Sequence, residues 1–191
     1  MISVEIYRKI VHLFSSIIPL SYIWFFKEKF LMIYLLVFLI LISVLIEFFR
    51  NKNGYIKYLF NNYFYFMLRK NESKGAITGA TWLLLGNIIT IYLYPIYIAV
   101  PALLFLSIGD SFAAIIGKFF STIKLGEKSL IGSLAGILSS IICVLFVNQV
   151  LPNNIIILGA VFAMLIELIP MPVNDNLTIP IISGLFMVII L

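Results

Sequence analysis

The sequence has little charge and almost no cysteine. Only 11% of its 191 residues are Asp, Glu, Lys or Arg, whereas a soluble domain usually carries about a quarter. So few charged side chains cannot cover a water-soluble globule, and the surplus apolar surface must face lipid. The single cysteine, Cys143, lies in an apolar run, which excludes a disulfide framework and a cysteine-based metal site.

In place of charge the sequence has long apolar runs. Hydrophobic residues make up 63% of the chain, and the mean hydropathy is +1.16. These runs predict an all-α, polytopic membrane helix bundle that forms one domain over 1–191. The seven predicted membrane spans are 10–26, 30–49, 76–94, 96–117, 132–151, 155–170 and 177–191.

The basic residues separate the apolar runs unequally. Because Lys and Arg collect in cytoplasmic loops, their placement predicts a cytoplasmic N-terminus. Only Lys27 and Lys29 fall in predicted outer loops. The lysines and arginines predicted inside are Arg8, Lys9, Arg50, Lys52, Lys57, Arg69, Lys70, Lys74, Lys118, Lys124 and Lys128. A net charge of +5 spread in this way favours anionic lipid headgroups over nucleic acid as its partner.

The segment 55–70 between the second and third spans is aromatic but interrupted by polar residues. Lys57, Asn61, Tyr65 and Arg69 recur every fourth position, which places them on one face of a helix. This pattern predicts an amphipathic helix in the inner interface. Such a helix either anchors the protein to the surface or admits a lipid substrate.

Asp110 lies inside the fourth predicted span. A carboxylate at that depth is costly unless it faces protein, water or a cation, so an intramembrane acid indicates function. Gly109, Ala113 and Gly117 follow at four-residue spacing, and Gly132 and Gly136 form a matching stripe, so the fourth and fifth spans are expected to pack closely. The loop between them concentrates groups that can hold phosphates. They are Lys118, Lys124, Glu127, Lys128 and Ser129.

Two further polar groups lie at predicted inner ends of helices. Near the N-terminus, acid, base and imidazole side chains share one helix face. They are Glu5, Arg8, Lys9 and His12. After the sixth span, Glu167 is followed by Pro170, Pro172 and then Asn174-Asp175-Asn176. The prolines end the helix, and the Asn and Asp side chains either cap the next one or, with Asp110 and Glu167, bind Mg²⁺ and phosphate oxygens.

Taken in order, these blocks resemble the dolichol kinase, phytol kinase and CTP-dependent diacylglycerol kinase family, which belongs with the phosphatidate cytidylyltransferase-like membrane enzymes. The blocks that carry the resemblance are Glu5 with Arg8-Lys9 and His12, Thr78-Gly79-Ala80-Thr81, 109–114 with Gly117-Lys118, Lys128-Ser129 with 132–136, and 167–170 with 175–180. The chain departs from the family pattern at Ile131, where the family usually has a glutamate that Glu127 would have to replace.

The resemblance implies a membrane enzyme that transfers the γ-phosphate of CTP to the hydroxyl of a polyprenol, phytol or diacylglycerol. It implies catalytic roles for Asp110, Glu167 and Asp175, with Mg²⁺ or Mn²⁺ held by Asp110 and Asp175. The residues it implies for nucleotide and phosphate binding are Arg8, Lys9, His12, Lys118, Lys128, Ser129, Gly132, Ser133, Asn174 and Asn176. The expected location is the cytoplasmic membrane of a prokaryote, with the site on the cytoplasmic side.

Two other functions fit parts of the sequence. A cytidylyltransferase would use the same nucleotide and metal to form a CDP-lipid and release pyrophosphate. A small transporter or scaffold would use the buried acids to move ions or to pair structurally, and it would spread polar residues across the membrane depth. The sequence leaves the lipid alcohol and the oligomeric state open.

Overall fold

Helices form almost the whole chain, as the apolar runs predict. The computed structural model describes residues 2–64, 67–120, 123–125, 128–148, 150–170 and 173–191. Its helices are α1 (Ile2–Phe14), α2 (Ile17–Trp24), α3 (Lys29–Lys52), α4 (Gly54–Phe64), α5 (Lys70–Ser73), α6 (Gly79–Leu93), α7 (Ile96–Leu104), the π-helical turn η2 (Phe105–Asp110), α8 (Ser111–Phe120), α9 (Leu130–Val147), α10 (Asn153–Leu168) and α11 (Asp175–Ile190). The short strands β1 (Lys124–Leu125) and β2 (Lys128–Ser129) pair as an antiparallel hairpin between α8 and α9.

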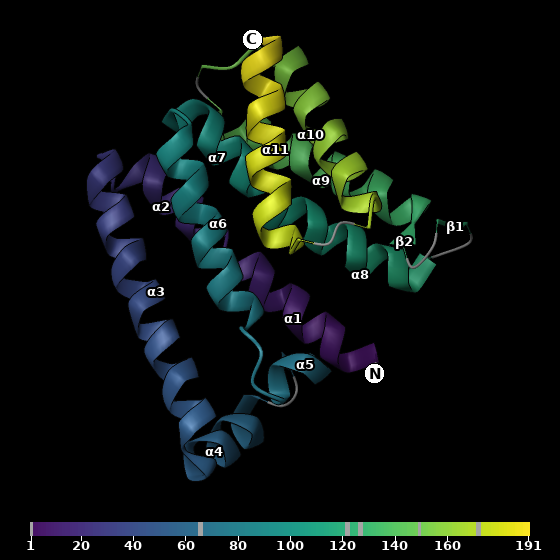
Figure 1. Cartoon of the computed structure of the whole chain (residues 1–191). Coiled ribbons are helices and arrows are strands. Elements are labelled where there is room, and N and C mark those ends of the chain that lie inside the picture. The colour runs from purple at the N-terminus through teal and green to yellow at the C-terminus, as the bar shows by residue number, and fades with distance from the viewer. Residues whose placement is uncertain (1, 65–66, 121–122, 126–127, 149, 171–172) are drawn as a thin grey trace.

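The centre of the bundle is one continuous helix made of α7, η2 and α8. Every residue from 98 to 104 is buried, as expected for a helix that is apolar on all sides. Around it pack α9, α10, α11 and α6, while α1 and α2 cross it on another side. Figure 1 shows α3 at the edge of the molecule, where it contacts α6 and leads down to α4.

The two small-residue stripes pack against each other as predicted. A Cβ at Gly132 would collide with the Ala113 carbonyl oxygen and lie 2.9 Å from the Cα of Gly117. A Cβ at Gly136 would lie 2.8 Å from the Gly109 carbonyl oxygen. The backbones of α8 and α9 therefore approach closely because neither stripe has side chains to separate them.

The membrane assignment is confirmed in its coarser form. Among the described residues, three helices are long and apolar enough to cross a bilayer, namely Lys29–Lys52, Ile96–Phe120 and Leu130–Val147. They match the predicted second, fourth and fifth spans. The predicted third, sixth and seventh spans correspond to the shorter apolar helices Gly79–Leu93, Asn153–Leu168 and Asp175–Ile190, so the full set of seven membrane spans stays a prediction.

The predicted span 10–26 is wrong as one continuous helix, because a turn at Ser15 and Ser16 divides it into α1 and α2. Pro19 has no N–H and cannot donate to the Ser15 carbonyl four residues earlier. The Ile18 N–H donates to that carbonyl instead, at 3.0 Å. The break leaves α1 as a separate helix that carries the N-terminal polar group.

The predicted amphipathic helix over 55–70 is confirmed only in its first half. Helix α4 ends at Phe64, and Tyr65 lies outside the described residues. Arg69 is wrong as a member of this helix face, because its backbone is extended and it forms the N-cap of α5. The Glu72 side chain stabilises this new start by accepting the Arg69 N–H at 2.9 Å.

The α8–α9 seam gives a stability prediction. Gly132→Ala introduces a methyl group against the Ala113 backbone and should lower the free energy of unfolding by about 1–3 kcal/mol, the usual cost of overpacking. The measurement is SDS titration of the purified protein in detergent micelles. Gly54→Ala is the matched control, because a Cβ there meets nothing within 4 Å. Equal stability of the two variants would contradict the close backbone packing.

Candidate functional site

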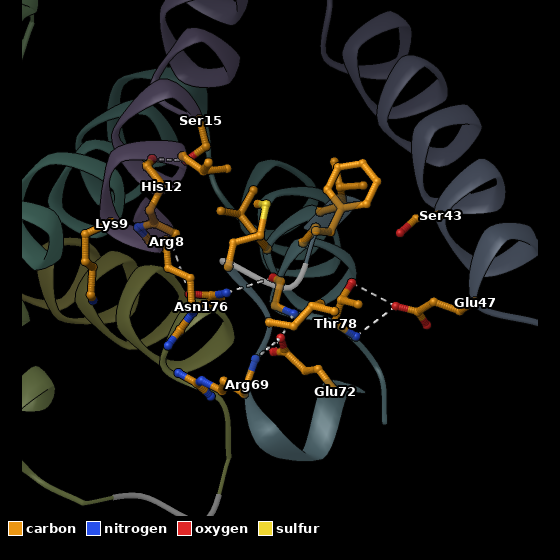
Figure 2. Close-up of a pocket in the computed structure, with 18 of the residues that line it drawn as sticks. Arg8, Lys9, His12, Ser15, Ser43, Glu47, Arg69, Glu72, Thr78 and Asn176 are labelled. Atoms are coloured by element: carbon orange, nitrogen blue, oxygen red, sulfur yellow. Dashed lines mark hydrogen bonds between the residues drawn. The ribbon is translucent and has the colours of Figure 1, made fainter. Parts of the chain in front are cut away.

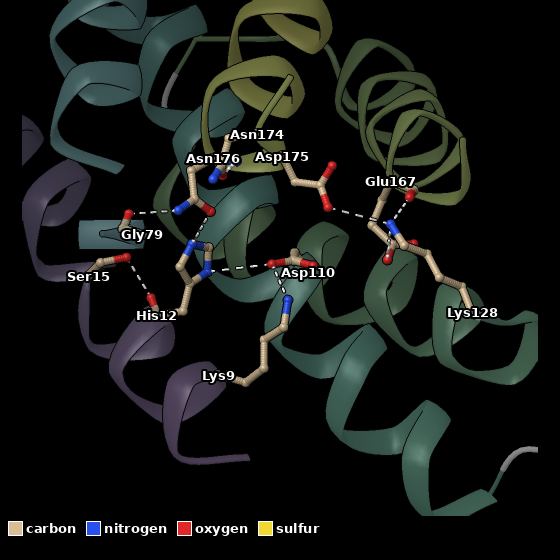
Figure 3. Close-up of polar contacts among 10 residues, drawn as sticks. All are labelled: Lys9, His12, Ser15, Gly79, Asp110, Lys128, Glu167, Asn174, Asp175 and Asn176. Atoms are coloured by element: carbon tan, nitrogen blue, oxygen red, sulfur yellow. Dashed lines mark hydrogen bonds and ion pairs between the residues drawn. The ribbon is translucent and has the colours of Figure 1, made fainter. Parts of the chain in front are cut away.

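Asp110 is the last residue of the π-helical turn in the central helix. Only 3% of its surface is exposed, so its charge must be compensated by protein groups. Helix α1 supplies them. Lys9 Nζ donates to Asp110 Oδ2 at 2.5 Å, and His12 Nδ1 lies 3.6 Å from the same oxygen. Two members of the predicted N-terminal group, Lys9 and His12, therefore form one cluster with the predicted intramembrane acid (Figure 3).

His12 continues this cluster towards α11 and α6. Asn176 Nδ2 donates to the Gly79 carbonyl at 2.9 Å, which turns Asn176 Oδ1 towards His12 Nε2 at 3.0 Å. Since that oxygen can only accept, Nε2 carries the hydrogen, and in the neutral ring Nδ1 keeps its lone pair. Gly86 makes the arrangement possible, because any Cβ there would collide with the Asn176 backbone carbonyl.

A second cluster lies beside the first and is centred on Lys128. Lys128 Nζ lies 2.9 Å from Glu167 Oε1 and 3.6 Å from Asp175 Oδ2, and it also donates to the Glu167 backbone carbonyl. Burial by itself lowers the pKa of Lys128, but the negative charges of Glu167 and Asp175 outweigh that effect and raise it above its ordinary value. Lys128 therefore stays protonated, as a phosphate-binding lysine must.

Two cavities meet at Asp110. We call the first the apolar chamber; its volume is about 420 Å³, and much of its wall is hydrocarbon. Its apolar lining residues include Val11, Ile46, Phe60, Phe64, Leu83 and Leu84. The second, the polar chamber, has a volume of about 380 Å³. Its lining residues include Glu5, Lys118, Lys124, Lys128, Ser133 and Glu167. The wall shared by both chambers contains Arg8, Lys9, Arg69, Asp110 and Asp175.

Most of the predicted site residues line these chambers. Glu5 is held in the polar chamber by Lys118, whose Nζ lies 3.0 Å from Glu5 Oε2. Burial raises the pKa of Glu5, but the hydrogen bond and charge of Lys118 outweigh it and lower the pKa. His12 and Asn176 line the apolar chamber. Ser129 and Ser133 line the polar chamber, and Ser129 Oγ also caps α9 by accepting the Gly132 N–H at 3.3 Å.

Two predicted site residues, and the position that departs from the family pattern, do not line either chamber. Gly132 packs under α8, and Asn174 caps α11 by accepting the Asn176 N–H at 3.1 Å. Neither lines a chamber, and neither does Ile131, which lies in the first turn of α9. Glu127, the residue expected to replace the family glutamate, lies outside the described residues.

Sequence reasoning missed a polar hub at the far end of the apolar chamber. Glu47 Oε1 accepts the Thr78 N–H and the Thr78 hydroxyl, each at 2.8 Å (Figure 2). It also accepts the Thr81 hydroxyl at 2.8 Å. Ser43 adds a hydrogen bond of 2.6 Å to Thr81. Glu47 is an acid inside the predicted second span, so its position marks it in the same way as that of Asp110.

Glu72 was missed as well, and no pattern in the sequence marks it. It is 6% exposed. Its Oε1 accepts the Gly79 N–H at 3.1 Å and its Oε2 accepts the Arg69 N–H. Glu72 thereby ties α5 to the start of α6 and places Arg69 on the shared wall.

The described residues contain no cluster of three or more His, Cys, Asp or Glu side chains with metal-binding geometry. The carboxylates nearest to the junction are instead paired with Lys9 and Lys128. Glu167 Oε2 is buried and has no hydrogen-bond donor within the described part of the chain. The site thus offers carboxylate oxygens, one of them unsatisfied, next to several cations.

The fold and these residues define an α-helical membrane protein with paired acidic and basic side chains between an apolar and a polar chamber. No protein-family model and no solved structure matches the chain. A protein of Rickettsia prowazekii (strain Madrid E), described as uncharacterized protein RP860, is 30% identical over 182 residues. The match covers 91% of this chain and 88% of the rickettsial protein. The chain therefore belongs to the same family as that protein.

The Lys9–Asp110 pair gives a second prediction. Lys9→Met leaves the Asp110 carboxylate buried beside an apolar side chain and should cost about 3 kcal/mol of stability. Adding Asp110→Asn removes the uncompensated charge and should recover much of that loss. SDS titration of the two single variants and the double variant measures the coupling, which should exceed about 1 kcal/mol. Lys124→Met, at an exposed position of the hairpin, is the control; additive effects at Lys9 and Asp110 would show that the pair does not stabilise the fold.

Proposed function

We propose that the protein is a lipid-alcohol kinase that transfers the γ-phosphate of CTP to the hydroxyl of a membrane lipid at the cytoplasmic face. The lipid is a polyprenol, phytol or diacylglycerol. The observation that carries the proposal is the pair of chambers that share Asp110, Asp175, Lys9, Arg8 and Arg69 as one wall. Such a wall lies where the head of an apolar substrate and the end of a polar one can meet.

The polar chamber suits the nucleotide. Lys118, Lys124 and Lys128 line it, and ammonium groups are general phosphate ligands. Phosphoryl transfer requires mainly positioning and cations against the charge that develops on the phosphate oxygens. The apolar chamber suits a lipid tail. His12 and Asn176 also line it, next to Asp110, and are placed to orient a hydroxyl there.

The donor set fits a magnesium ion bound together with a nucleotide. Mg²⁺ sites in such enzymes use one or two carboxylates, with phosphates and water completing the coordination, so a cage of three protein acids is not required. Asp110 and Asp175, which both line the shared wall, are the proposed ligands. The ion would neutralise phosphate charge. Lys9 and Lys128 lie next to these carboxylates and would contribute positive charge to the same phosphates.

In the proposed reaction the lipid hydroxyl oxygen bonds to the γ-phosphorus while the bond from that phosphorus to the β–γ bridging oxygen breaks. CDP leaves with the electron pair of that bond. The hydroxyl proton passes to Glu167, whose Oε2 is buried without a hydrogen-bond donor among the described residues. A general base in this position contributes less than the positioning of the two substrates.

The test is incubation of the purified protein with Mg²⁺, a lipid extract and CTP labelled on the γ-phosphate. A kinase puts the label on lipid, and chelation of the metal abolishes transfer. Asp110→Asn should reduce transfer by at least about a thousandfold, because it removes a charge at the reacting centre. Its folding is checked by the melting temperature. Glu28→Gln, which changes an acid at the start of α3 far along the chain from the site, should retain full activity.

The other outcomes separate the alternatives. Label found only in pyrophosphate would replace the kinase with a CDP-lipid-forming cytidylyltransferase. The absence of any nucleotide-dependent product would favour a transporter or scaffold. A fully active Asp110→Asn protein would remove Asp110 from the mechanism.

A further inference from the structure

Two arginines face each other on the wall that the chambers share. Arg8 belongs to α1, and Arg69 forms the N-cap of α5. Figure 2 shows their side chains turned towards each other where they line the apolar chamber. Within the described residues, neither guanidinium has a carboxylate at ion-pair distance. Arg8 is half-buried and Arg69 is exposed, and the two charges are juxtaposed on the wall with no carboxylate of the described residues paired to either.

The two like charges disfavour each other. Burial and then the charge of Arg69 lower the pKa of Arg8, while Glu72, Glu5 and Asp110 compensate only in part from a distance. Like charges held together are stabilised when an anion binds between them. A guanidinium also offers a planar fork of N–H donors that matches two oxygens of a phosphate.

The fold holds both arginines from buried anchors. On one side, the ion pair of the adjacent Lys9 with Asp110 attaches α1 to the central helix. On the other side, the buried Glu72 carboxylate accepts the N–H groups of Arg69 and Gly79. The backbone of each arginine is thus fixed independently of any ion pair between its side chain and a carboxylate.

The position of the pair indicates which phosphate it binds. Lys118, Lys124 and Lys128 line only the polar chamber. Lys9, Arg8 and Arg69 line both chambers, but Lys9 is paired with Asp110. If both arginines hold a phosphate, a hydrocarbon chain attached to that phosphate can occupy the apolar chamber. A nucleotide has no hydrocarbon chain to fill that apolar chamber.

We propose that Arg8 and Arg69 form a clamp for a phosphomonoester at the head of a lipid chain. The interpretation of this ligand as the reaction product rests on the proposed kinase function. The γ-phosphate of a nucleotide has the same chemistry, so the experiment compares the two sources directly.

The experiment measures the rise in melting temperature of the protein in detergent micelles with dodecyl phosphate, dodecanol or CTP as the added ligand. Ligands that bind the folded state raise this temperature, and at equal concentration a tighter ligand raises it more. Dodecyl phosphate should stabilise the native protein and dodecanol much less. Arg69→Gln should weaken the apparent affinity for dodecyl phosphate about tenfold or more, the effect of losing one charged hydrogen-bonding group. The affinity of Arg69→Lys for dodecyl phosphate should lie between those of the native protein and Arg69→Gln, because lysine retains the charge but lacks the planar fork of N–H donors.

Lys57→Gln is the matched control, since it removes the same charge from α4 at a residue that lines neither chamber. Its affinity for dodecyl phosphate should equal that of the native protein, and Arg69→Gln should retain CTP affinity within about threefold. Loss of CTP affinity with dodecyl phosphate binding intact would overturn the lipid assignment. Native-like dodecyl phosphate binding by Arg69→Gln would overturn the clamp. If Arg69→Gln does not fold, Arg69→Lys decides between these results.

These results are independent of turnover. Arginine-dependent binding of dodecyl phosphate in a protein that transfers no phosphate would refute the kinase and keep the clamp. Lipid phosphorylation by a protein whose Arg69 variants bind dodecyl phosphate normally would keep the kinase and refute the clamp.

Discussion

The carboxylate of Asp110 is buried in a bundle with very little other charge, and the arrangement of the site follows from the need to compensate it. An unpaired carboxylate at that depth would be far too costly to keep ionised. Lys9 compensates it directly, and His12 lies beside it. Both belong to α1, so the ion pair attaches the first helix to the central one. The same contact places Arg8 on the shared wall and orients His12 towards Asn176.

The second consequence is a site with two different surroundings on its two sides. Helices α1, α3, α4 and α6 contribute the apolar chamber, and the ends of α8 and α10, the hairpin and the start of α9 contribute the polar one. A reaction between a lipid hydroxyl and a water-soluble phosphate donor requires such a junction, because each substrate is stable in only one of the two environments. In the proposed reaction, the shared wall would surround the charged transition state with cations instead of water.

Several residues that line the chambers could be identified from the sequence, whereas others depend on how the chain folds. Asp110, Lys9, Lys128 and Glu167 were identifiable because charge is rare in this chain, and each charged residue near a helix end is therefore informative. The α8–α9 contact was identifiable because glycine spacing reports helix approach directly. Arg69 and Glu72 were not, since they lie in a polar segment where charge is ordinary. Their importance depends on how that segment folds back onto the start of α6.

The two errors in helix boundaries also arise from local structure that residue types do not reveal. Hydropathy averages over a window, so it joined α1 and α2 across a turn that depends on the single missing N–H of Pro19. The periodicity of Lys57 and Asn61 continued by chance to Arg69, although a side chain three residues further on starts a new helix there. Both events are set by one hydrogen bond, which a pattern of residue types does not contain.

The π-helical turn explains how one helix serves both packing and chemistry. A π turn holds about one residue more than an α turn, which rotates the following side chains by roughly 100° relative to an uninterrupted helix. From the end of this turn onwards, Gly109, Ala113 and Gly117 face α9, while Asp110, the last residue of the turn, reaches α1. Before it, α7 is buried on all sides by apolar contacts. The wide turn therefore changes which way the side chains of α8 face relative to those of α7. Helix α7 only packs, whereas the helix from Gly109 onwards has a glycine seam on one face and a charged residue on another.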